Sequence, residues 1–105
     1  MNWIQVGKLE DIPRQGSRVV NTPRGEIAMF RSGDDQVFAL ENRCPHKGGP
    51  LSQGIVHGKR VTCPMHSWVI ELETGNAVAP DTGCARRHEV RVAHGVLFLE
   101  AGIED

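Results

Sequence analysis

Glycine and proline interrupt this chain at short intervals, and that spacing restricts its fold more than any other feature. The twelve glycines and six prolines fall in turn-like stretches such as NTPRGE, PHKGGP and PDTG. No window between them keeps helical periodicity over three turns. Many short strands separated by turns favour an all-β sandwich or small barrel. We predict strands at residues 18–22, 25–31, 36–41, 59–63, 67–73, 88–94 and 96–101, with a hairpin tip at 93–95.

The length of 105 residues suits one domain, and we expect residues 1–105 to form it. Twelve Lys and Arg against thirteen Asp and Glu give a net charge of −1 without a block of either sign. This balance argues against a nucleic-acid or membrane-surface partner. No segment approaches the roughly 20 apolar residues of a membrane helix, and the first residues do not resemble a signal peptide. We expect a cytoplasmic protein.

Cysteine and histidine alternate within residues 44–66, the most distinctive stretch of the chain. Cys44 and His46 follow one predicted strand, and Cys63 and His66 follow another. Three cysteines do not suit a fully paired disulfide framework, and these two each lie two or three residues before a histidine. Metal binding explains these two cysteines better than disulfide formation does. Two loops that each offer one thiolate and one imidazole can form a four-ligand site at one end of a sheet.

The order of these ligands bears on the kind of metal site. A zinc finger of the C2H2 kind groups its cysteines in one turn and its histidines on a following helix, and neither feature is present. Alternation suits a dinuclear centre, with two cysteines on one iron and two histidines on the other. Cys84 has no histidine at ligand spacing, and we expect it to be a buried, small apolar residue. We interpret His57, His88 and His94 as surface or strand histidines.

Cys-Pro-His, followed after sixteen residues by Cys-Pro-Met-His, resembles the signature of Rieske proteins. The stretch CPHKGGPLSQGIVHGKRVTCPMHSWVIELETG, with the later DTGCARRHEVRV, is most similar to the small subunit of siroheme-containing NAD(P)H nitrite reductases. The resemblance implies the Rieske fold of stacked antiparallel β-sheets. Loops 44–50 and 63–68 would form its cluster-binding subdomain, and Pro80 sits where Rieske proteins carry a third loop over the cluster.

The resemblance also implies a cofactor and its ligands. A [2Fe–2S] cluster would have one iron bound by Cys44 and Cys63 and the other by His46 and His66. Respiratory-complex Rieske proteins raise the reduction potential with Ser and Tyr hydroxyls after the second histidine and with a disulfide between the loops.

Neither device for raising the potential is present here. Trp68 and Ile70 hold the hydroxyl positions, the chain has no Tyr, and neither loop has a spare cysteine. We predict a potential in the lower part of the Rieske range of about −150 to +300 mV. Ser67 can still donate a hydrogen bond to a cluster sulfur, and we expect Trp68 to pack in the core beneath the cluster.

For function, the resemblance implies electron transfer as the small subunit of NAD(P)H nitrite reductase, which reduces nitrite to ammonia in nitrate assimilation. Its partner would be a large subunit with siroheme and flavin. The chain has no G-x-G-x-x-G motif and no second set of four cysteines, so it would be an electron carrier without catalytic residues of its own. One alternative is a free-standing Rieske ferredoxin that supplies an aromatic-ring oxygenase. Another is a zinc-bound or metal-free structural module.

Overall fold

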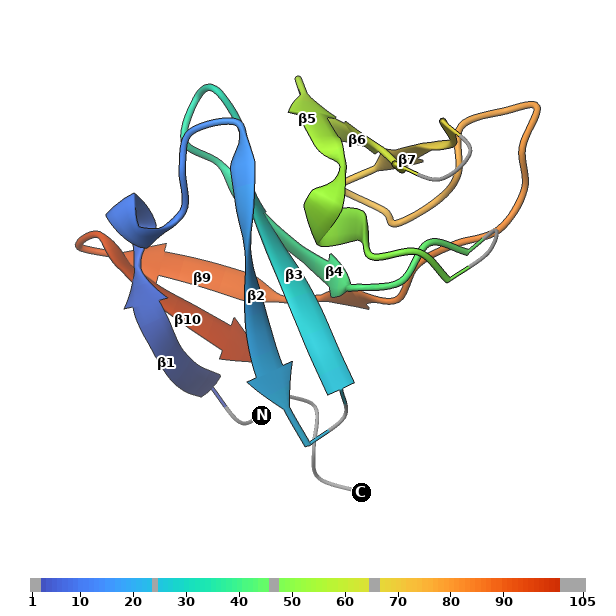
Figure 1. Cartoon of the computed structure of the whole chain (residues 1–105). Helices are drawn as coiled ribbons and strands as arrows, with labels where there is room; N and C mark the ends of the chain where they lie inside the picture. The colour runs from blue at the N-terminus through green and yellow to red at the C-terminus, as the bar shows by residue number, and fades with distance from the viewer. Residues whose placement is uncertain (1–2, 24, 46–47, 65–66, 101–105) are drawn as a thin grey trace.

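The computed structural model describes residues 3–23, 25–45, 48–64 and 67–100. In these ranges the strands form three antiparallel sheets, stacked as layers (Figure 1). The central sheet has the order β2 (Gly16–Thr22), β3 (Gly25–Arg31), β4 (Val37–Glu41) and β8 (Arg87–His88). The outer sheet has the order β1 (Trp3–Lys8), β10 (Val96–Glu100) and β9 (Val90–Ala93). The small sheet has the order β5 (Ile55–His57), β6 (Arg60–Thr62) and β7 (Val69–Glu71).

Two short 3-10 helices complete the regular structure in this part of the chain. They are η1 (Leu9–Asp11), after β1, and η2 (Leu51–Gln53), before β5. Neither is long enough or apolar enough to cross a lipid bilayer.

Strand β3 is buried on both faces because the central sheet lies between the other two. Successive side chains of a strand point to opposite faces. Ala28 and Phe30 therefore join one buried cluster, and Ile27 and Met29 join another. We name them the loop-side core and the outer core. The loop-side core contains Ala28, Phe30, Leu40, Cys44, Leu51, Val56, Val61, Cys63, Ile70, Leu72 and Ala85. The outer core contains Ile12, Ile27, Met29, Ala39, Leu97 and Leu99.

The predicted all-β class with stacked antiparallel sheets is confirmed, and so is the hairpin tip at 93–95, where Ala93 pairs with Val96. Two strands were missed. The pairing of β1 with β10 shifts register between Gln5 and Gly7, which breaks the alternation expected of a strand. Strand β5 has only three residues, too few for a periodic pattern.

Several predicted strands differ from the structure by one or two residues at their ends, and two differ by more. The strand predicted at 67–73 covers only Val69–Glu71. It begins late because Ser67 has a positive φ of 61° that a strand does not accommodate, and it ends at a turn closed by the hydrogen bond from the Gly75 N–H to the Glu71 carbonyl. The strand predicted at 88–94 is divided at Glu89. Its first part, β8, pairs with β4 in the central sheet, and its second part, β9, pairs with β10 in the outer sheet. The chain thus passes between two layers at this point.

Candidate metal centre

The first predicted ligand loop, residues 44–50, follows β4 after two residues. Backbone hydrogen bonds close it into a tight turn. The Cys44 N–H donates to the Gly49 carbonyl at 2.7 Å, and the Gly48 N–H donates to the Cys44 carbonyl at 2.8 Å. Gly48 has a φ of +75°, which glycine adopts without steric cost.

The two ends of this loop are joined by Asn42. Its side-chain oxygen accepts a hydrogen bond from the Ser52 N–H at 2.8 Å, and its amide nitrogen donates to the Glu26 carboxylate at 3.0 Å. The Ser17 hydroxyl in β2 donates to the Ser52 carbonyl at 2.6 Å. The loop is therefore anchored to the central sheet before and after its turn. Sequence reasoning missed this contribution of Asn42, because both partners lie at least ten residues away along the chain.

The second predicted loop, residues 63–68, connects β6 to β7 with the same backbone hydrogen bonds. The Cys63 N–H donates to the Trp68 carbonyl at 2.7 Å, and the Ser67 N–H donates to the Cys63 carbonyl at 3.2 Å. Ser67 occupies the place of Gly48, with a φ of 61° against 75°. Each loop thus turns over the same number of residues after a Cys-Pro pair, so the two cysteines are equivalently placed in their loops.

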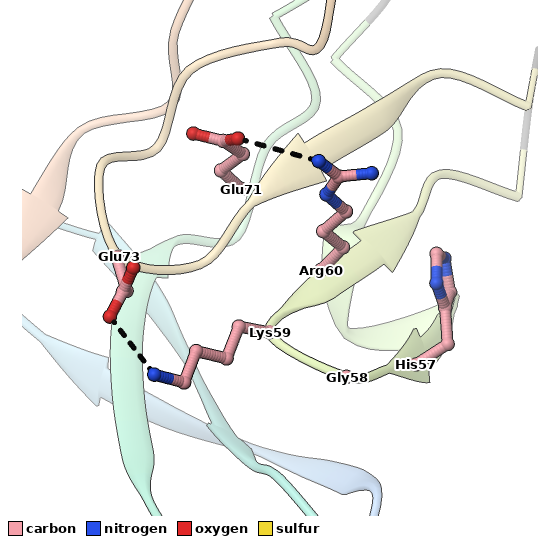
Figure 2. A pocket seen from close by; sticks show the side chains of 6 residues that line it. All are labelled: His57, Gly58, Lys59, Arg60, Glu71 and Glu73. Atoms are coloured by element: carbon pink, nitrogen blue, oxygen red, sulfur yellow. Dashed lines mark hydrogen bonds and ion pairs between the residues drawn. The ribbon is translucent and has the colours of Figure 1, made fainter.

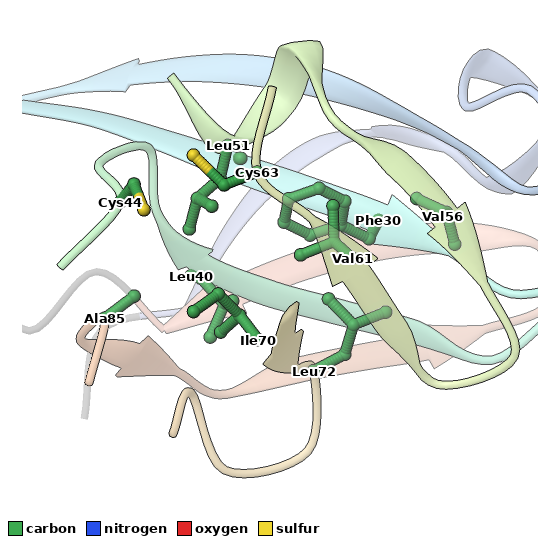
Figure 3. Close-up of a cluster of buried hydrophobic side chains, with 11 residues drawn as sticks. Phe30, Leu40, Cys44, Leu51, Val56, Val61, Cys63, Ile70, Leu72 and Ala85 are labelled. Atoms are coloured by element: carbon green, nitrogen blue, oxygen red, sulfur yellow. The ribbon is translucent and has the colours of Figure 1, made fainter. Parts of the chain in front are cut away.

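Cys44 and Cys63 lie at the same end of the loop-side core, as Figure 3 shows. Their exposed fractions are 2% and 1%, and none of the three cysteines forms a disulfide. Thiolates are the ligands that iron–sulfur clusters prefer. A buried thiolate also needs a positive partner, because an isolated charge is costly in apolar surroundings. This cysteine pair therefore fits one iron of a mixed-ligand cluster.

The imidazole half of the predicted site, His46 and His66, lies outside the described residues. Within the described ranges no group of three or more His, Cys, Asp and Glu is arranged to hold a metal ion. That result is expected if two of the four ligands belong to the remaining residues. The assignment of all four ligands therefore stays a prediction.

The prediction that Cys84 is buried was wrong, because its side chain is exposed. The neighbouring Ala85 points inward with 2% exposure and packs in the loop-side core, so Cys84 points outward. Two of the remaining histidines agree with the prediction of surface residues, since His57 and His94 are exposed. His88 is a half-buried residue of β8.

Gly83, in the segment that follows Pro80, lies against both ligand loops, and that this segment covers the cluster stays a prediction. A Cβ atom built on Gly83 would lie 3.1 Å from Cβ of Pro45 and 3.9 Å from the Trp68 ring. The Ala79–Pro80 peptide bond in this segment is cis. Trp68 itself is half-buried and packs against the loop-side core, which confirms the prediction that it is a packing residue.

Replacing Ser67 with glycine is expected to stabilise the protein by about 0.5–1 kcal/mol. A left-handed backbone costs a non-glycine residue about 1–2 kcal/mol, and the greater freedom of glycine in the unfolded chain offsets part of the gain. The measurement is the midpoint of urea unfolding under anaerobic conditions. A lower midpoint for Ser67→Gly would mean that the serine hydroxyl stabilises the loop by more than its backbone strain costs.

Gly48→Ala is the matched variant for the other loop, and we expect it to destabilise the protein by about 1 kcal/mol. The nearest atom to a Cβ at this position would be Nε of the flexible Arg43 side chain, at 3.3 Å. The expected loss therefore reflects the φ of +75° rather than a lack of space.

The family of the chain follows from comparison with known proteins. The model of the Rieske [2Fe-2S] domain family matches residues 2–92. The chain belongs to this family. Its cofactor is accordingly a [2Fe–2S] cluster, which supplies transfer of one electron at a time when bound.

Curated relatives of this Rieske domain include both small and large proteins. The anthranilate 1,2-dioxygenase ferredoxin subunit of Burkholderia cepacia is 30% identical over 101 residues, which cover 95% of this chain and 93% of that protein. Protein TIC 55 of Pisum sativum is 29% identical over 106 residues, which cover 92% of this chain but 19% of TIC 55. The chain spans a fifth or less of the length of the larger relatives that it matches.

Solved structures show the same Rieske fold. A chain from the complex of reduced oxygenase and oxidised ferredoxin in carbazole 1,9a-dioxygenase has a TM-score of 0.83 and 30% identity, and the match covers 97% of both chains. A candidate NADH-dependent nitrite reductase small subunit from Mycobacterium tuberculosis also has a TM-score of 0.83, with 23% identity and 93% of both chains covered. Because the second structure is only 23% identical to this chain, its similarity shows a shared fold alone.

Proposed function

We propose that this Rieske domain is an electron carrier that acts beside a larger oxidoreductase. The observation that supports this most directly is the pair of buried cysteines, Cys44 and Cys63, in two loops with the same hydrogen-bond pattern. Since the loops and the core exclude water from both thiols, this end of the domain can hold a charged iron–sulfur centre. The chain contributes binding and positioning of the cluster, and we propose that the catalytic groups of the reaction lie outside these residues.

For the ligands, we propose that Cys44 and Cys63 bind one iron and that His46 and His66 bind the other. The two cysteines support this by their burial at one end of the loop-side core. The assignment of the two histidines as ligands rests on their spacing from the cysteines in the sequence. We further propose that residues 1–105 form a single Rieske-type domain.

Our first proposal for the partner is the large siroheme and flavin subunit of NAD(P)H nitrite reductase. The resemblance of residues 44–75 and 81–92 to the small subunit of that enzyme supports it. A structure assigned to such a subunit shares the fold over 93% of both chains. In this role the chain would deliver electrons for the reduction of nitrite to ammonia, in the cytoplasm.

A second proposal, a free-standing ferredoxin of an aromatic-ring dioxygenase, has its own support. The ferredoxin subunit of Burkholderia cepacia matches almost end to end at 30% identity, and the carbazole dioxygenase complex matches equally well. The two proposals share the cluster and the fold, and they differ in the protein that accepts the electron.

The experiment begins with protein purified without oxygen. We expect about two irons and two acid-labile sulfides per chain, no zinc, and a Rieske-type electron paramagnetic resonance spectrum after reduction with dithionite. A colourless protein with zinc, or a folded protein without metal, would contradict the electron-carrier proposal.

The reduced protein is then mixed with each acceptor, and its reoxidation is followed by visible absorption. Reoxidation that requires both nitrite and the siroheme subunit would support the nitrite reductase proposal. Reoxidation by the oxygenase component of a dioxygenase, without nitrite, would support the ferredoxin proposal and contradict the first one.

A further inference from the structure

The two ligand loops share the same turn, but they are held differently outside it. The second loop is flanked by β6 and β7, whose backbones pair next to the turn, with Thr62 opposite Val69. Side chains of the two strands also meet further along, because Arg60 lies 3.7 Å from the Glu71 carboxylate, as Figure 2 shows. Backbone pairing next to a turn fixes both of its ends. The small sheet itself therefore sets the position of Cys63.

The first loop lacks this pairing. Counted from the cysteines, Arg43 and Pro50 hold the places of Thr62 and Val69. Proline has no N–H, so Pro50 cannot donate a ladder hydrogen bond. The residues that follow it form the 3-10 helix η2 and not a strand. Among the described residues, no backbone hydrogen bond beyond the turn joins the chain before this loop to the chain after it.

The Asn42 side chain supplies the missing connection. Its Oδ1 accepts a hydrogen bond from the Ser52 N–H at 2.8 Å, and its Nδ2 donates to the Glu26 carboxylate at 3.0 Å. The Asn42 N–H also donates to the Glu26 carbonyl at 3.0 Å. Because both ends of the side-chain amide are engaged, its orientation is fixed. One side chain thus ties strand β3 to the chain on both sides of the first loop.

The residue that Asn42 holds lies where the first loop enters the core. Ser52 follows Leu51, which is fully buried and packs in the loop-side core with Cys44. The Ser17 hydroxyl holds the Ser52 carbonyl from the other side, at 2.6 Å. Asn42 is half-buried, so water competes less for its hydrogen bonds than at an exposed site. A shift of Ser52 would therefore displace Leu51 and the turn beside it.

We propose that Asn42 is a positioning residue for the iron–sulfur cluster, because its side chain replaces in the first loop the strand pairing that holds the second. The inference rests on the proposed role of Cys44 as a ligand. Groups that orient metal ligands through hydrogen bonds strongly affect how well the metal is held. Without Asn42, the place of Cys44 relative to Cys63 would no longer be fixed, and the cluster would be released more readily.

The first test follows the loss of the cluster from the cluster-containing protein in the presence of an iron chelator, by visible absorption. Asn42→Ala should shorten the half-time of the cluster at least about fivefold. It should also broaden the electron paramagnetic resonance spectrum of the reduced protein, because the loop adopts more than one position. Asn21→Ala is the matched control, since Asn21 is exposed on β2 opposite Glu26 and lies outside both loops. We expect its half-time to stay within about twofold of wild type.

A double substitution separates positioning from a general loss of stability. Asn42→Asp keeps an acceptor for the Ser52 N–H, but it removes the donor and places a second carboxylate beside Glu26. Its half-time should fall as that of Asn42→Ala does. Adding Glu26→Gln restores this contact with donor and acceptor exchanged, so the half-time should return to within about twofold of wild type. The spectrum should return with it, and a double variant as labile as Asn42→Asp would contradict the role of Asn42.

A second readout does not depend on the cluster. Hydrogen exchange measured by mass spectrometry reports how firmly each loop is held. Peptides that contain Ser52 should exchange at least about fivefold faster in Asn42→Ala than in wild type, because the Ser52 N–H loses its acceptor. Peptides that contain Cys63 should be unchanged, since the Cys63 N–H donates to the Trp68 carbonyl.

The outcomes separate this inference from the proposed function. Wild-type protein purified without oxygen that holds no iron would contradict the electron-carrier function, whatever the exchange rates. A wild type with its cluster, together with an unchanged half-time and spectrum in Asn42→Ala, would overturn the role of Asn42 alone. Unchanged exchange at Ser52 in Asn42→Ala would overturn that role whether or not iron is bound.

Discussion

Replacing Cys63 with alanine is expected to reduce the bound iron to less than about one-tenth of the wild-type amount per chain. The variant removes one of the two thiolates proposed for the same iron, and the apolar surroundings of Cys63 offer no substitute ligand among the described residues. Iron, acid-labile sulfide and visible absorption, measured on protein purified without oxygen, check this result.

Cys84→Ala is the matched control for that variant, because it removes the one cysteine that is exposed and outside both loops. We expect it to keep the wild-type iron and sulfide content. Full iron in Cys63→Ala would show that the ligand assignment is wrong. Loss of iron in Cys84→Ala would assign a ligand role to the third cysteine instead.

Phe30→Ala is expected to lower the free energy of unfolding by about 3–5 kcal/mol. Phe30 lies on β3, an interior strand of the central sheet, with no exposed area, and in the loop-side core it packs together with residues of the small sheet, such as Val61 and Ile70 (Figure 3). Its loss would leave a cavity between two layers. Since small domains are stable by about 5–15 kcal/mol, this single change would remove a large share of the total.

Urea unfolding followed by circular dichroism measures this effect. Val19→Ala on the neighbouring strand β2 is the control, because 36% of Val19 is exposed and we expect a loss below about 1 kcal/mol. Equal losses in the two variants would contradict the central position of Phe30 between the sheets.

Local sequence signals predicted the features of this protein that depend on neighbouring residues. The apolar run of residues 25–31 between two turns predicted the exact limits of β3. The Cys-Pro pairs predicted two turns, and both cysteines lie in matching turns of the structure. Signals of this kind are visible because the interacting groups are within a few residues of one another.

Features that the residue types do not signal were missed or mistaken. The strand predicted at 67–73 begins only at Val69, because the hydrogen bond to Cys63 holds the Ser67 backbone in the left-handed region, which its residue type does not suggest. Cys84 is exposed because Ala85 takes the inward position in the loop-side core. Arg86 lies beside Glu41, 45 residues away, through two hydrogen bonds of 2.7 Å. None of these contacts leaves a periodic pattern in the sequence.

The burial of the two cysteines in the loop-side core also bears on the speed of electron transfer. When an electron arrives, nearby dipoles must reorient around the new charge, and mobile water contributes most to this reorganisation energy. Around Cys44 and Cys63 the neighbours are close-packed side chains such as Leu51 and Ala85, which move little. If these thiolates hold one iron as proposed, few groups on that side of the cluster need to reorient when its charge changes. The packing that stabilises the fold would then also lower the barrier to accepting and releasing an electron.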